Sequence, residues 1–149
     1  MRALDDSGER AALWQAWLES GPDTPNPHEE GGFVLLEADG RLSVERWPQG
    51  GQDRIEFSGY ASGLRRGRPI VATFHTHPNP APEYRQEPSR TDIRAVRDDA
   101  DLQHSYYEGE LVIAREATYP IHSDGQVLLL GRTMEVLTGS VNRPQRSGG

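Results

Sequence analysis

The stretch that decides the fold reads RPIVATFHTHP and occupies positions 68–78. Its β-branched and aromatic residues, with apolar side chains at alternating positions, predict a β-strand. Side chains two positions apart in a strand point to the same face, so His75 and His77 should project together. The apolar side chains of the opposite face should enter the core, and they are Ile70, Ala72 and Phe74.

A carboxylate downstream of this strand completes a possible set of metal ligands. Asp92 follows a proline-rich insert at positions 78–88 and lies at the start of a predicted helix. Because the chain has no cysteine, a metal would have to be held by nitrogen and oxygen atoms. Two imidazoles and one carboxylate, with a fourth position left to water, are typical of a catalytic zinc site. We therefore predict one Zn²⁺ per chain, held by His75, His77 and Asp92.

The segment from Ser89 to Asp92 also has a purely structural interpretation. Serine followed three residues later by an acid is a capping-box pattern, and an acid in the first turn complements the helix dipole. The two interpretations are compatible, because a helix start would hold Asp92 rigidly. A lone histidine at a strand end is usually an ordinary polar residue, whereas a histidine pair followed by an aspartate favours metal binding.

These residues together resemble the signature of the JAMM, or MPN-plus (JAB domain), family of zinc metallopeptidases. The signature combines a glutamate on an early strand with His-x-His-Pro and Ser-x-x-Asp, matched here at positions 75–78 and 89–92. The segment 27–35 fits the upstream pattern Pro-x-Glu-x-x-Gly followed by an apolar strand. The resemblance covers residues 12–130, with an insert at 78–88 that is longer than is usual in the family.

The resemblance implies catalytic roles for two further residues. Glu29 would be the general base and acid that takes a proton from water and delivers it to the leaving amine. Glu30 is the alternative, because neighbouring strand residues face opposite ways, although the spacing to Gly32 favours Glu29. Both could also be acids on a solvated loop. Ser89 would stabilise the oxyanion of the tetrahedral intermediate, unless it serves only as the helix cap.

The implied activity is hydrolysis of a peptide or isopeptide bond after the C-terminal tail of ubiquitin, or of a ubiquitin-like or sulfur-carrier protein. We expect this tail to bind beside the histidine strand by strand addition, with the insert 78–88 as a flap. An activating or conjugating enzyme of the same pathway could act beside it. The alternative function is a non-catalytic MPN-type scaffold or binding module in a larger assembly. A nucleobase deaminase is disfavoured, because the chain lacks Pro-Cys-x-x-Cys.

Length and charge limit the other possibilities. The 149 residues suit one domain, which we place at 1–139, followed by a polar flexible tail at 140–149. A net charge of −7 argues against nucleic-acid binding. No apolar run approaches the length of a membrane span, so no membrane association is expected. The N-terminal residues lack the layout of a secretory signal, which predicts a cytoplasmic location.

The remaining elements follow from periodicity and turn residues. We expect a helix at 9–19 after a capping box at 6–9, and an amphipathic helix from Ser89 to about His104. The expected strands are 32–37, 41–47, 110–119 and 126–130, with 53–60 undecided between strand and irregular edge. Asp39-Gly40 predicts a hairpin. This order predicts a mixed α/β domain, and the resemblance implies a curved sheet flanked by helices, with a cytidine-deaminase-like layout.

Overall fold

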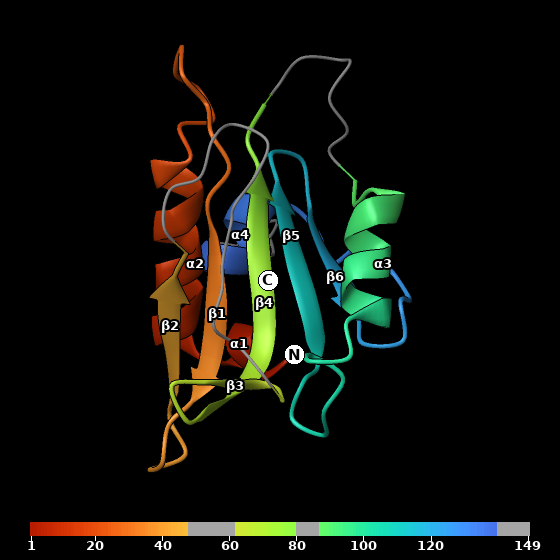
Figure 1. Cartoon of the computed structure of the whole chain (residues 1–149). Helices are drawn as coiled ribbons and strands as arrows, with labels where there is room; N and C mark the ends of the chain where they lie inside the picture. Colours follow the sequence, from red (N-terminus) through yellow and green to blue (C-terminus); the bar gives the residue numbers. More distant parts are fainter. Residues whose placement is uncertain (48–61, 80–86, 140–149) are drawn as a thin grey trace, which may run out of the picture.

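The computed structural model describes residues 1–47, 62–79 and 87–139. Within them the chain has an α/β fold with helices on both faces of a mixed six-stranded sheet, as expected (Figure 1). The helices are α1 (Arg2–Asp5), α2 (Ser7–Glu19), α3 (Arg90–Asp98) and α4 (Thr133–Thr138). The strands are β1 (Gly31–Leu36), β2 (Leu42–Arg46), β3 (Leu64–Arg65), β4 (Arg68–His77), β5 (Gly109–Ala114) and β6 (Thr118–His122).

The histidine strand, β4, lies in the middle of the sheet. The strand order is β2-β1-β4-β5-β6, and the short β3 pairs with the first residues of β4. Among the strands that the structure describes, β4 and β5 are the one parallel pair, and the chain between them contains α3, because parallel neighbours need a crossover connection. β4 pairs with β1 over residues 70–75 and with β5 over residues 72–77. The expected addition of a substrate strand beside β4 is therefore wrong, since both of its edges are used.

The sheet separates two hydrophobic clusters. On one face α1, α2 and α4 pack on alternate residues of the strands, such as Val34, Phe74 and Leu111. On the other face α3 and the chain after it pack on the residues between them, such as Phe33 and Val112. Figure 1 shows α3 alone in front of the sheet and the other three helices behind it. The metal-ligand candidates lie on the face that α3 covers.

One of the three residues expected to face away from the histidines does not. Ala72 and Phe74 are buried under α2, as predicted, but Ile70 is buried in the cluster on the α3 face. The pairing of β1 with β4 shifts register between Val34 and Leu35, where Leu35 pairs with Ile70 and Val71 is the extra residue. Such a bulge changes which side chains point to which face.

Helix boundaries depart from the sequence prediction at both long helices. α2 begins at Ser7 rather than Glu9, because the Asp6 side chain accepts hydrogen bonds from the N–H groups of Gly8 and Glu9. α3 ends at Asp98, well before His104. The next residue, Asp99, has extended backbone and accepts the N–H of Asp101 with its side chain, a local bond that competes with the helix. The short helices α1 and α4 were not predicted.

The expected strand at 110–119 is a hairpin made of β5 and β6. Its turn closes through a hydrogen bond from the Ala114 N–H to the Ala117 carbonyl, without a glycine or proline to mark it. The expected strand at 126–130 is also wrong, since this segment forms only the isolated bridge of Val127 with Ile121 in β6, and a second bridge to β6 lies just beyond it at Gly131. Pro120 in β6 has no N–H to donate, so the ladder is interrupted there. The hairpin at Asp39-Gly40 is confirmed.

Several predictions fall on residues that the structure does not describe: the strand at 53–60, most of the insert at 78–88 and the tail at 140–149. Among the described residues, no helix combines the length and the apolar character needed to cross a membrane.

Candidate metal centre

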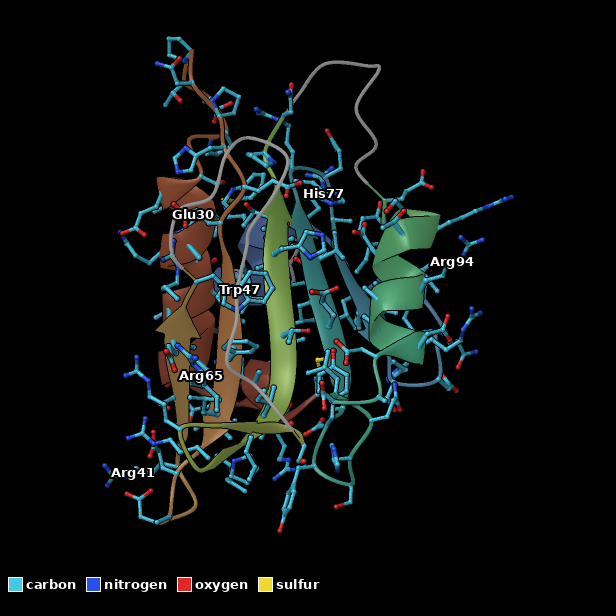
Figure 2. All side chains as sticks on the ribbon, in the orientation of Figure 1. Glu30, Arg41, Trp47, Arg65, His77 and Arg94 are labelled. Carbon is cyan, nitrogen blue, oxygen red and sulfur yellow. The ribbon has the colours of Figure 1, made fainter. Side chains whose placement is uncertain are left out.

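The two histidines project together from the end of β4, as the strand period predicts. Their Nε2 atoms are 3.0 Å apart and the ring centroids 4.8 Å apart. The exposed fraction is 10% for the His75 side chain and 14% for His77. The two Nε2 atoms therefore lie close together at the C-terminal end of β4, where His77 is labelled in Figure 2.

Asp92 reaches the same point from the first turn of α3. Its Oδ1 lies 3.5 Å from Nε2 of His75, and its Oδ2 lies 3.6 Å from Nε2 of His77. The expected capping box is present: Ser89 Oγ accepts the Asp92 N–H at 3.0 Å, and Asp92 Oδ2 accepts the Ser89 N–H at 2.7 Å. The cap thus orients the carboxylate toward the histidines, despite the long insert before it.

The spacing of these atoms fits a metal ion. Ligand atoms about 2.0–2.1 Å from a tetrahedral zinc lie about 3.3–3.4 Å from one another. The shortest separations among His75, His77 and Asp92 run from 3.0 to 3.6 Å, with Oδ1 of Asp92 nearest His75 and Oδ2 nearest His77, and one ligand atom from each residue lies within 4.8 Å of the other two. Among the described residues, these three are the group whose histidine and carboxylate atoms could hold a metal ion. Two nitrogens and one oxygen are also a donor set that zinc accepts.

Several titratable groups lie close together at this partly buried site. Burial alone would lower the pKa of His75, but the carboxylates of Glu110 and Asp92 raise it well above its usual value. Burial alone would raise the pKa of Asp92, but the hydrogen bond and charge of His75, helped by the Ser89 N–H, hold it well below its usual value. Carboxylates therefore outweigh desolvation here, and the site attracts positive charge.

A second acid, Glu110 of β5, contacts one of the metal-ligand candidates, His75. Glu110 was not identified from the sequence. Its Oε1 lies 3.2 Å from Nδ1 of His75, on the side of the ring away from His77 and Asp92. Its side chain is 9% exposed. Glu110 is the lone charged residue of the otherwise apolar β5, which is a signal that sequence reading could have used. Its partner could not be found, because the parallel register of β4 and β5 is not visible in the sequence.

The structure separates the two candidate glutamates. Glu29 lines a cavity together with His75, Asp92 and Glu110. Glu30 is buried, and its carboxylate bonds to Arg46 Nη2 and to His28 Nε2, each at 2.8 Å. Figure 2 shows Glu30 on the side of β1 away from β4. Glu29, the residue favoured by spacing, therefore shares a cavity with two of the metal-ligand candidates, His75 and Asp92.

The cavity extends from the metal-ligand candidates along the face of the sheet beneath α3. Its walls include Thr91 and Ala95 of α3, Asp99 directly after that helix, and Trp47. Trp47 lies over Gly31, where an added Cβ would be 2.5 Å from the indole ring. Thr73 lines the floor and hydrogen-bonds to the Tyr107 hydroxyl at 2.8 Å. The cavity is therefore partly acidic and partly apolar.

Some of the site residues expected from the sequence line this cavity, and the others contact a residue that does. Glu29, His75 and Asp92 line it directly. His77 joins through its contact with His75, and Ser89 through its bonds to Asp92. No family model matches the chain, and no curated protein or solved structure is detectably similar to it.

Proposed function

We propose that this protein is a zinc-dependent metallopeptidase or isopeptidase. The observation that carries the proposal is the convergence of His75, His77 and Asp92, one ligand atom of each within 4.8 Å of the others, with Glu29 on the same cavity. The resemblance of the motifs to the JAMM family supports it independently of the geometry. The proposal rests on these residues and their arrangement.

Each residue of the site has a part in this reaction. Zinc held by His75, His77 and Asp92 would supply a Lewis acid that polarises the scissile carbonyl and lowers the pKa of an attacking water. Glu29 accepts the proton of that water and returns it to the leaving amine. The Ser89 hydroxyl, whose oxygen already accepts the Asp92 N–H, turns its own proton toward the oxyanion.

The substrate class follows from the resemblance. We propose a protein with a flexible C-terminal tail, such as ubiquitin or a ubiquitin-like or sulfur-carrier protein, cut at the peptide or isopeptide bond after that tail. An activating or conjugating enzyme is the proposed partner. The tail reaches the cavity by a path other than pairing with β4, which is occupied on both edges.

Metal content tests the proposal first. The purified protein, after reconstitution and desalting, should hold about one zinc per chain by elemental analysis. Asp92→Ala should lose most of it, because the substitution removes the proposed carboxylate ligand and the half of the capping box that its side chain makes with the Ser89 N–H. Asp98→Ala, which changes an exposed acid on the same helix, is the matched control and should keep the zinc. Absence of zinc from the parent would favour the scaffold alternative.

Cleavage assays then test the chemistry. Linear and isopeptide-linked fusions of ubiquitin-like proteins serve as substrates. Glu29→Gln should keep zinc and fold while losing cleavage by about 10²-fold or more, the range of general acid–base catalysis. A Glu29→Gln variant that cleaves as fast as the parent would exclude this residue as the base.

A further inference from the structure

His75 uses its two ring nitrogens in opposite directions. Its Nε2 faces His77 and Asp92, at 3.0 and 3.5 Å. Its Nδ1 faces Oε1 of Glu110 at 3.2 Å. Glu110 belongs to β5, two positions before the residue that pairs with His75, so the two side chains are diagonal neighbours on one face of the sheet. The histidine ring therefore lies between the proposed metal and a buried carboxylate.

The chemistry of imidazole links these two contacts. A neutral ring carries one proton, and the nitrogen without it has the lone pair that a metal needs. A proton on Nε2 would block ligation and would leave the Nδ1 lone pair facing the Glu110 carboxylate. A proton on Nδ1 satisfies the buried carboxylate, which is costly to leave without a donor, and frees Nε2.

We propose that Glu110 is a positioning residue that fixes the ring orientation and tautomer of His75 for metal binding. A carboxylate behind a ligating histidine raises the basicity of the ligand and typically contributes 10–100-fold to metal affinity. Glu110 does not touch the reacting atoms in this role, because the ring of His75 separates it from them. The inference rests on the metal-binding part of the proposed function.

A plain ion pair in the core is the competing explanation of the same contact. It predicts that loss of Glu110 lowers stability and leaves zinc affinity unchanged in the folded protein. Zinc affinity therefore distinguishes the two explanations, and it can be measured without knowing the substrate. The variants are Glu110→Gln, which keeps an acceptor without the charge, and Glu110→Ala, which removes both.

The experiment is competition for zinc against a chromophoric chelator, using full-length protein whose fold is verified by circular dichroism. Glu110→Ala should bind zinc about 10–100-fold more weakly than the parent, with Glu110→Gln between them. Glu108→Gln is the matched control, since Glu108 lies two residues away and pairs with Arg2. It should bind zinc like the parent.

Nitrogen-15 NMR of the zinc-loaded protein supplies a second measurement. The Nδ1 proton of His75 should be protected from exchange with water in the parent and lose that protection in Glu110→Ala. A parent that binds zinc, with Glu110 variants that match it within twofold, would overturn the role of Glu110 alone. A parent that binds no zinc would overturn both this role and the proposed function.

Discussion

Thr76 and Glu30 are joined by a reciprocal pair of buried hydrogen bonds. The Glu30 N–H donates to Thr76 Oγ1 at 3.0 Å, and the Thr76 N–H donates to the Glu30 carbonyl at 2.9 Å. Thr76 lies between the two histidines, and Glu30 follows Glu29. The pair therefore connects the backbone beside the proposed base to the backbone that carries two proposed metal ligands.

Removing the hydroxyl of Thr76 should weaken this connection. Thr76→Val leaves the buried Glu30 N–H without an acceptor, which costs about 1–3 kcal/mol. The free energy of unfolding, measured by denaturant titration, should fall by that amount. Thr76→Ser keeps the hydroxyl and should lose less. Equal stability of the valine and serine variants would show that the bond contributes nothing.

Loss of the Arg46 side chain should lower stability far more than loss of the charge of Glu19, its exposed partner. Arg46→Met removes the guanidinium that lies 2.8 Å from the buried Glu30 carboxylate, and breaking such a pair costs about 3 kcal/mol or more. Glu19 also binds Arg46, but at the surface, so Glu19→Gln should cost below about 1 kcal/mol. Thermal melts of the two variants provide the comparison, and similar losses would contradict it.

Glu9 should make the protein less stable at neutral pH than in mild acid, as far as this one group is concerned. Burial, reinforced by the negative charge of Asp6, raises the pKa of Glu9 above its usual 4.5. A raised folded-state pKa contributes stability below the unfolded pKa, and this contribution is lost as the pH rises through the folded pKa. Glu9→Gln resembles the protonated form at every pH.

The Glu9→Gln variant should therefore melt at a higher temperature than the parent at pH 7, and the difference should vanish below about pH 4. Each kcal/mol corresponds to about 2–4 °C in a domain of this size. Melting temperatures at pH 4, 5.5 and 7 measure the effect. A difference that is constant across this range would show that ionisation of Glu9 is not its cause.

Gly31 should tolerate no side chain. A Cβ there would lie 2.5 Å from the Trp47 ring and 2.7 Å from the Phe74 carbonyl, so Gly31→Ala must displace the indole from the cavity wall. Overpacking of this kind costs about 1–3 kcal/mol. The near-ultraviolet circular dichroism spectrum, to which Trp47 contributes, should change, and the melting temperature should fall. An unchanged spectrum and melting temperature would contradict the contact.

The sequence predicted the metal-ligand candidates better than the residue that contacts one of them from the neighbouring strand. The strand period was sufficient to place His75 and His77 together, and the capping box was sufficient to orient Asp92. Both are local patterns, set by residues within one turn or one strand. Glu110 contacts His75 across the parallel pairing of β4 with β5, and no local pattern in the sequence contains the register of that pairing.

The errors have similar physical causes. The apolar run at 126–130 has strand composition, yet Pro120 on the neighbouring strand interrupts its ladder. The end of α3 was placed too late because Leu102 is apolar at a helical spacing, although Asp99 turns the chain first. Ile70 was assigned to the wrong face because a bulge in β4 has no marker in the sequence.

The crossover from β4 through α3 to β5 has a consequence for how substitutions can affect this protein during evolution. The proposed metal ligands and Glu110 all lie on that single continuous piece of chain, whereas Glu29 comes from the separate segment before β1. In the proposed function, metal binding and proton transfer would thus depend on two separate segments of the chain. Substitution at Glu29 could silence the chemistry while the metal remained as structural support, whereas damage within the crossover would remove both.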